Sequence, residues 1–128
     1  MITVEGYGEQ MDGFKVVFHV DEVSKRKLTL VNVKNFVEDI ADAEYSIEIV
    51  ANAEAVIIFA DNRAENTEEL VGEMKFLISK GVTISACRNA LRANVIAEER
   101  LPSFISIVPA GVTRLAILQR QGYSYIKP

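Results

Sequence analysis

The chain has 128 residues, 49% of them hydrophobic, and a formal net charge of -4. This length and composition are typical of a single compact domain with a sizeable core. The acidic balance argues against the phosphate-neutralising surface that nucleic-acid binding requires. Lys25, Arg26 and Lys27 form a short basic run, but three charges at the start of a helix are typical of a solvated face.

Composition also bears on location and on bound groups. No apolar stretch approaches the ~20 residues that span a bilayer, and the N-terminus lacks the order of a signal peptide. The chain has one cysteine, Cys87, and one histidine, His19, so it cannot form an internal disulfide and falls short of a closed zinc site. We therefore expect a cytoplasmic protein with no membrane span, no metal and no cofactor.

The first thirteen residues contain three glycines and no sustained periodicity. They are interpreted as a weakly ordered leader or an extra edge segment, so that a single domain covers residues 14–128.

Residues 14–20, FKVVFHV, form an apolar run that indicates a strand buried on both faces of a sheet. A helix is predicted next, because apolar residues recur at helical spacing: Leu30, Val33, Val37 and Ile40.

Residues 45–50, YSIEIV, alternate well enough for a second strand. The segment AEAVIIFADN, residues 53–62, has strand propensity, but a loop this short would force an antiparallel hairpin into an alternation of strands and helices. We therefore predict a short buried helix there. The next helix is predicted to be capped by Asn66, with Glu69 in the capping-box position, and to stop at Gly81.

The last third of the chain continues the alternation. Three further strands are predicted, at residues 82–86 (VTISA), 104–108 (FISIV) and 123–126 (YSYI). Residues 88–94 read as a short helix between the first two, and Pro102 marks a break before the second. The last helix is expected to place Val112, Leu115 and Leu118 on one side and to end at Gly122.

Strands separated by helical crossovers imply a mainly parallel sheet with helices on both faces, which is a three-layer α/β/α architecture of about five strands. In such sheets, ligands bind outside the carboxyl ends of the strands. Several polar or small residues are predicted at these ends: Asp21 and Glu22, residues 51–54, Cys87 with Arg88 and Asn89, and Ala110 with Gly111. Cys87 is therefore expected at the rim where chemistry occurs.

Two interpretations of Cys87 follow from the residues alone. A free cysteine is among the most buried residue types and often acts as a small hydrophobic side chain. A thiol at a helix N-terminus beside Arg88, however, experiences two fields that favour the thiolate. The first interpretation makes Cys87 part of the packing, and the second makes it a reactive nucleophile.

The other candidates carry weaker signals. His19 lies in an apolar strand and is interpreted as a hydrogen-bonded core histidine with an unidentified partner. Asp21 and Glu22 are interpreted as loop residues, since adjacent side chains of an extended chain point to opposite faces. Tyr123 and Tyr125 are expected to stabilise the last strand or a subunit contact. No serine-hydrolase or nucleotide-binding motif can be assembled.

Five segments in this order resemble the DsrE/DsrF-like (YchN-like) family: KVVFHVDE at 15–22, IEIVAN at 47–52, GVTISACRNALRA at 81–93, VPAGV at 108–112 and QGYSYIKP at 121–128. The resemblance implies a flavodoxin-like domain with a five-stranded parallel sheet, which does not in itself imply flavin. It also implies a homo-oligomer, usually a trimer or a hexamer.

In the sulfur-relay members of that family, a cysteine at the place of Cys87 accepts sulfur as a persulfide and passes it to a partner. The resemblance therefore implies a small oligomeric sulfur carrier or sulfurtransferase-like protein that works with sulfur donor and acceptor proteins. The expected binding residues around Cys87 are Asn52, Glu54, Arg88, Asn89 and Gly111. The alternative is a non-enzymatic oligomeric module that binds a small ligand or a partner at the same rim.

Overall fold

The computed structural model describes residues 2–3, 10–11, 13–60 and 67–128. Its main sheet has five strands in the order β6-β5-β4-β3-β7, and every neighbouring pair is parallel. The strands are β3 (Phe14–Val20), β4 (Tyr45–Ala51), β5 (Thr83–Cys87), β6 (Ser106–Val108) and β7 (Ser124–Ile126). The sheet confirms the predicted fold class.

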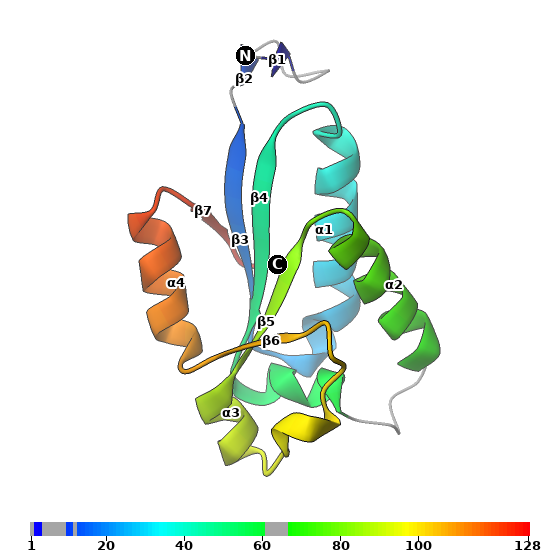
Figure 1. The fold of residues 1–128 in the computed structure, drawn as a ribbon, viewed down its shortest axis with the longest axis vertical. Coiled ribbons are helices and arrows are strands. Elements are labelled where there is room, and N and C mark those ends of the chain that lie inside the picture. The colour runs from blue at the N-terminus through cyan, green and yellow to red at the C-terminus, as the bar shows by residue number, and fades with distance from the viewer. Residues whose placement is uncertain (1, 4–9, 12, 61–66) are drawn as a thin grey trace.

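Helices cover both faces of this sheet, as Figure 1 shows. Helices α1 (Arg26–Asp39) and α2 (Thr67–Ser79) lie on one face, and α4 (Gly111–Arg120) lies on the other. The short helix α3 (Arg88–Ala93) and the 3-10 helices η1 (Val23–Lys25) and η3 (Glu98–Arg100) lie around the carboxyl ends of the strands. The three predicted layers are therefore present.

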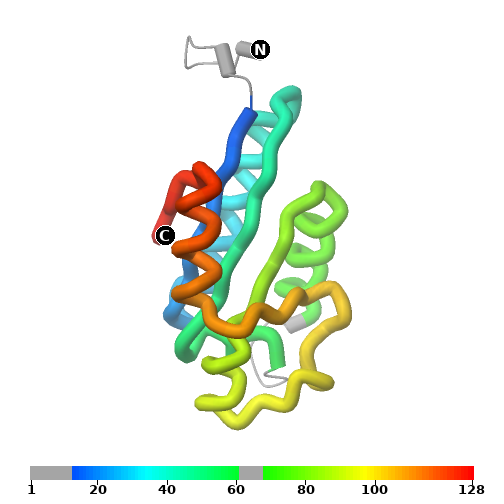
Figure 2. Tube along the Cα trace, turned by 60° about the vertical axis from the view of Figure 1, so that its left-hand side comes forward, coloured from blue at the N-terminus to red at the C-terminus, as the bar shows by residue number. Residues whose placement is uncertain are grey.

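The strand order follows from the connections. Strands β3 to β6 are added one after another, and α4 then returns across the opposite face to place β7 beside β3. Figure 2 shows α4 in front of the sheet on that face, and α4 does not lie over β5. The larger core lies under α1 and α2, whereas α4 buries a small cluster of Val17, Val50, Leu115 and Leu118.

The ambiguous segment after β4 is helical, as predicted, and forms the 3-10 helix η2 (Ala53–Phe59). Ala55, Val56 and Phe59 are buried in it, so its apolar residues serve burial rather than strand pairing. Helix α2 stops where Gly81 adopts a φ of 87°, because this left-handed conformation favours glycine. The predicted cap at Asn66 lies outside the described residues.

In the C-terminal third, β5 (Thr83–Cys87) and β7 (Ser124–Ile126) differ from their predicted bounds by one residue, and two larger differences have a physical cause. Strand β6 begins at Ser106 rather than at residue 104, because the Ile105 amide donates to the Pro102 carbonyl in a turn. Val112, Leu115 and Leu118 were predicted on one side of α4, but Val112 does not share the burial of the two leucines, since it is 71% exposed. The buried positions of α4 are Gly111, Leu115 and Leu118, so the glycine and not the valine packs with the two leucines.

The N-terminal segment has its own small sheet. Strand β1 (Ile2–Thr3) pairs antiparallel with β2 (Gln10–Met11), and neither pairs with a strand of the main sheet. Residues 1, 4–9 and 12, on which much of the predicted leader falls, lie outside the described residues. Among the helices of the described residues, none has the length and apolar character needed to cross a membrane.

Candidate functional site

Cys87 is the last residue of β5 and the residue that caps α3. The Ala90 amide donates a hydrogen bond to the Cys87 sulfur at 3.4 Å. The residue is 6% exposed, so the thiol lies just beneath the surface at the carboxyl edge of the sheet. This position provides a backbone donor that can stabilise negative charge on the sulfur.

Asn52 and Gly111 lie next to Cys87 at this edge. Ala51 of β4 pairs with Ala86 of β5, so Asn52 and Cys87 are the residues that follow two paired positions. A Cβ atom built on Gly111 would lie 2.9 Å from the Asn52 Cβ and 3.3 Å from the Cys87 Cβ. Only glycine allows the start of α4 to approach these two side chains so closely.

A chain of hydrogen bonds joins Asn52 to two other residues. The His19 Nε2 atom lies 2.8 Å from the Asn52 Oδ1, and the His19 Nδ1 atom lies 2.5 Å from the Tyr125 hydroxyl. Because a carbonyl oxygen only accepts, Nε2 is the donor of the bond to Asn52, whereas the Tyr125 hydroxyl can either donate to Nδ1 or accept from it. His19 thus has the hydrogen-bond partners that the sequence left unidentified.

The sequence prediction assigned Tyr125 to stabilising the last strand or a subunit contact and did not anticipate this chain of hydrogen bonds. The three residues lie on different strands or follow them, and their contact depends on the strand order, in which β7 and β4 flank β3. The signal that could have found it is the position of His19 and Asn52 near the ends of two consecutive strands.

Arg88 and Glu54 have partners other than the thiol. The Arg88 Nε donates to the Glu98 carboxylate at 2.8 Å, and its Nη2 donates at 3.3 Å. This pairing raises the pKa of Arg88 and lowers the pKa of Glu98.

The Glu54 carboxylate accepts a hydrogen bond from the Val23 amide at 3.2 Å, and this bond connects η2 to η1. Asn89 is exposed in the first turn of α3. Of the predicted binding residues, the structure therefore brings only Asn52 and Gly111 against Cys87.

An ion pair that the sequence did not predict joins α4 to β4 near the site. The Glu48 carboxylate, on β4, accepts two hydrogen bonds from Arg114, at 2.9 Å and 2.7 Å. It also accepts from the Ser85 hydroxyl at 3.1 Å. Glu48 is buried, and its hydrogen bond to the Arg114 guanidinium raises the pKa of Arg114. Arg114 is one turn from Gly111, so this ion pair holds the start of α4 in place.

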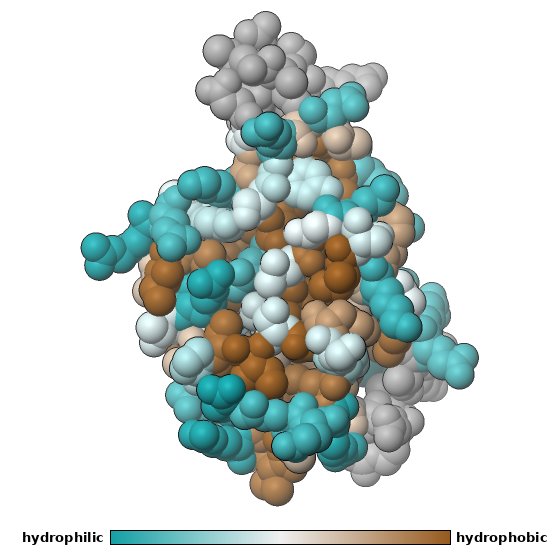
Figure 3. All heavy atoms as spheres, in the orientation of Figure 1, coloured by the Kyte–Doolittle hydropathy of each residue, from teal (hydrophilic) through white to brown (hydrophobic). Residues whose placement is uncertain are grey.

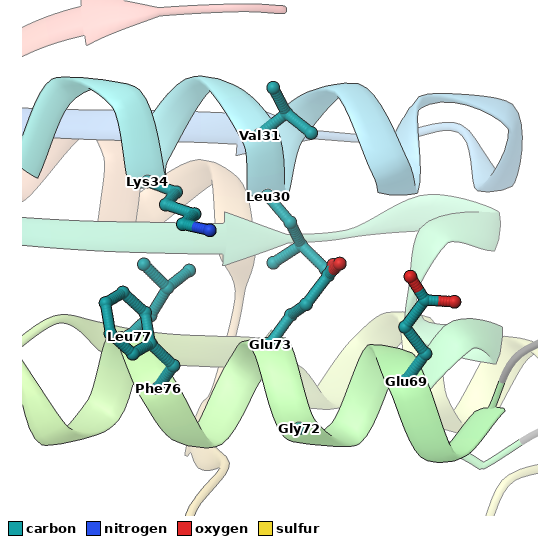
Figure 4. A pocket seen from close by; sticks show the side chains of 8 residues that line it. All are labelled: Leu30, Val31, Lys34, Glu69, Gly72, Glu73, Phe76 and Leu77. Atoms are coloured by element: carbon teal, nitrogen blue, oxygen red, sulfur yellow. The ribbon is translucent and has the colours of Figure 1, made fainter. Parts of the chain in front are cut away.

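A groove of about 330 Å³ lies away from this edge, between α1 and α2. Figure 4 shows side chains from both helices around it. Its lining residues are Leu30, Val31, Lys34, Glu69, Gly72, Glu73, Phe76 and Leu77. None of them belongs to the predicted site. In the part of the chain that the structure describes, no three His, Cys, Asp or Glu side chains are grouped to hold a metal ion.

Solved structures with the same fold include three similar chains. MTH1491 from Methanobacterium thermoautotrophicum, a protein of unknown function, is 32% identical, with a TM-score of 0.75 over 90% of this chain and 99% of that one. The ychN protein from E. coli is 13% identical, with a TM-score of 0.70 over 90% and 99% of the two chains. BT1422 from Bacteroides thetaiotaomicron, also of unknown function, is 14% identical, with a TM-score of 0.68 over 91% and 95%.

The family comparison agrees with the resemblance drawn from the sequence. No curated protein matches the chain. The model of the DsrE/DsrF-like family, however, matches residues 14–128, which include the whole main sheet and every residue of the candidate site. The chain therefore belongs to the DsrE/DsrF-like family.

Proposed function

We propose that this protein is a small oligomeric sulfur carrier, sulfurtransferase-like in its chemistry, in which Cys87 accepts sulfur as a persulfide. The observation that carries the proposal is the position of Cys87 at the carboxyl end of β5, where the Ala90 amide donates to its sulfur. Membership of a family linked to sulfur relay supports it. A reduced single thiol also suits a cytoplasmic location.

The chemistry that we propose is a sulfur exchange without an external oxidant. The Cys87 thiolate attacks the terminal sulfur of a donor persulfide, and a new S–S bond forms at the Cys87 sulfur. The S–S bond of the donor breaks, and its electron pair leaves with the donor thiolate. An acceptor thiolate then attacks the outer sulfur and releases Cys87 as a thiolate. Because the chain has one cysteine, no internal disulfide can discharge the persulfide.

Assembly into a homotrimer or homohexamer is part of the proposal. Helix α4 has two large apolar side chains that are exposed, Val112 at 71% and Ile117 at 42%. Figure 3 shows apolar surface exposed in the middle of the view, between polar side chains at its left and lower margins. Exposed apolar surface of this kind is typical of association sites.

A specific observation favours the second candidate, a non-enzymatic module that binds a small ligand or a partner. Cys87 is 6% exposed, whereas transfer to an acceptor requires an accessible outer sulfur. Glu54 and Asn89 are exposed at the same rim and offer polar groups to a ligand. In this alternative, Cys87 contributes to packing.

Sulfur loading separates the two functions. We expect incubation with a cysteine desulfurase and cysteine, or with inorganic polysulfide, to add the mass of one sulfur atom to each wild-type chain. The Cys87→Ser variant should show no adduct while keeping its circular dichroism spectrum and its assembly. Wild-type protein that stays unmodified under conditions that load a known acceptor would favour the binding module, and loss of assembly in Cys87→Ser would favour packing.

A further inference from the structure

Val95, just after α3, has a backbone conformation that disfavours its side chain. Its φ is 56°, in the left-handed region where a β-branched residue is an outlier. Two other helices, α2 and α4, are followed by glycines in this region, Gly81 with a φ of 87° and Gly122 with a φ of 92°. A glycine adopts this conformation without strain. The end of α3 therefore has a valine at the kind of position that α2 and α4 give to glycine.

Two backbone hydrogen bonds hold the turn in this conformation. The Ile96 amide donates to the Leu91 carbonyl at 2.9 Å, and the Val95 amide donates to the Arg92 carbonyl at 3.1 Å. These are the two bonds of a Schellman motif, in which the left-handed residue is usually glycine. The strain is therefore part of the way in which α3 ends.

Asn94 keeps the turn in this register. Asparagine tolerates the left-handed conformation better than valine does, so a turn shifted by one residue would be less strained. The Asn94 side chain, however, donates to the Ala90 carbonyl at 2.8 Å and to the Ala53 carbonyl at 3.3 Å. A shift would break both bonds, so the strain stays on Val95.

Packing within the chain does little to offset this strain. The Val95 side chain is 88% exposed, the largest exposed fraction among the large apolar side chains of the described residues. An apolar side chain gains free energy from burial only when other atoms cover it. Strained residues are concentrated at sites of function. Val95 therefore has the properties of a residue whose side chain serves a contact with another molecule.

Helix α3 connects Val95 to the thiol. Cys87 caps the start of α3 and Val95 follows its end, so eight steps with a rise of about 1.5 Å each separate them by about 12 Å along the helix. One side of a standard protein interface, about 800 Å², covers both. Figure 1 shows the loop between α3 and η3 at the carboxyl end of the sheet, and Figure 3 shows apolar surface projecting at that end beyond polar side chains.

We infer that Val95 is a docking anchor for a sulfur-donor protein, whose apolar pocket takes the Val95 side chain while its persulfide faces Cys87. This inference rests on the proposed function and deepens it, because it states how the protein donor is recognised. The sulfur exchange itself is the one described above. A small donor reaches Cys87 without touching Val95, so the anchor acts only on a donor that is large enough to cover both residues.

Three variants separate the apolar side chain from the strain. Val95→Ile keeps an apolar β-branched side chain, Val95→Thr keeps the shape and the strain but introduces a hydroxyl, and Val95→Gly removes both the side chain and the strain. The donor is a cysteine desulfurase with cysteine, at limiting concentration. We expect Val95→Ile to load within about twofold of the wild-type rate, and Val95→Thr and Val95→Gly at least about fivefold more slowly, as for the loss of apolar burial at an interface.

Two further measurements make the test specific to docking. Inorganic polysulfide should load all four chains at rates within about twofold of one another, because it needs no anchor. In urea denaturation, Val95→Gly should raise the ratio of folded to unfolded chains about threefold to fivefold, since the strain is removed. A docking residue thus predicts a variant that is more stable and yet slower with the protein donor alone.

Equal loading of all four chains by the desulfurase would overturn the anchor and leave the proposed function standing. A wild-type chain that takes sulfur from polysulfide but not from the desulfurase would do the same. Slower loading of Val95→Gly from both donors would overturn the anchor and assign Val95 to the accessibility of the thiol. A smaller mass of Val95→Gly in light scattering would also overturn it, because a second copy of the chain would then cover the side chain. If polysulfide leaves the wild type unmodified, the proposed function itself fails.

Discussion

The Arg114 guanidinium donates to both oxygens of the Glu48 carboxylate, at 2.7 Å to Oε1 and 2.9 Å to Oε2. This bidentate ion pair joins α4 to the middle strand of the sheet, on the face where the apolar core is small. The carboxylate side chain is 6% exposed and that of the arginine 33%. A planar guanidinium suits such a pair because it meets both carboxylate oxygens at once.

Removal of Arg114 should therefore be costly. We expect Arg114→Ala to lower the free energy of unfolding by about 2–4 kcal/mol, because a buried carboxylate would lose its counter-ion. Replacing both partners by leucine should cost less than the two single changes together, since no unpaired charge remains. Urea denaturation of the four proteins measures these differences, and additive losses would contradict the coupling.

Gly111 should tolerate no side chain. In Gly111→Ala, the new Cβ would lie 2.9 Å from the Asn52 Cβ and 3.3 Å from the Cys87 Cβ, and neither of these atoms can rotate away. We expect a loss of about 1–3 kcal/mol in the free energy of unfolding, as for other overpacked sites, together with slower sulfur loading because Asn52 must move. Native stability and a wild-type loading rate would show that α4 can shift without consequence.

Gly72 is the matched control, because it lies in α2 and a Cβ there would meet no atom within 4 Å. Glycine within a helix is less stable than alanine by roughly 0.5–1 kcal/mol. Gly72→Ala should therefore raise the free energy of unfolding by about this amount and leave Cys87 alkylation unchanged. A destabilised variant would mean that the surface between α1 and α2 does not have room for a methyl group.

These contacts also show what the sequence could and could not predict. Residues 14–20 became β3 because an apolar run of that length suits a buried parallel strand. The helix over residues 53–59 was predictable from topology although its propensity favoured a strand. Local patterns thus sufficed for the strands of the main sheet, and the alternation of strands and helices sufficed for η2 and for the parallel pairing.

The site was predictable only in part, because its contacts are distant in sequence. Glu48 and Arg114 are 66 residues apart, and His19 and Tyr125 are 106 apart. Val112 was predicted on one side of the last helix with Leu115 and Leu118, whereas Gly111 is the residue that is buried with these two leucines. A glycine carries no hydrophobic signal, so its close contact with Asn52 and Cys87 was visible only in three dimensions.

The ion pair between Arg88 and Glu98 predicts a pH dependence. Its hydrogen bonds lower the pKa of Glu98 below the usual value, so the folded state holds this carboxylate ionised at lower pH than the unfolded state does. The contribution to stability is therefore fully present above the unfolded pKa of about 4.3 and is lost as pH falls through the folded pKa. We expect Glu98→Gln to melt below the wild type at pH 7 and together with it in strong acid. A difference that persists in acid would assign the effect to packing.

The last prediction concerns assembly through the face that carries α4. Val112 is 71% exposed in the single chain, so Val112→Asp should change the stability of a lone subunit by less than about 0.5 kcal/mol. If this face packs against other subunits, the same change would bury a charge without a partner and would dissociate the oligomer.

The control variant is Leu28→Asp on α1, which lies on the opposite face of the sheet and is 44% exposed. Light scattering should give a mass of three or six chains for the wild type and for Leu28→Asp, and a smaller mass for Val112→Asp at micromolar concentration. A wild-type mass near 14.2 kDa, the value for one chain, would overturn the proposed assembly. Dissociation of Leu28→Asp with an intact Val112→Asp oligomer would instead place the interface over α1 and α2.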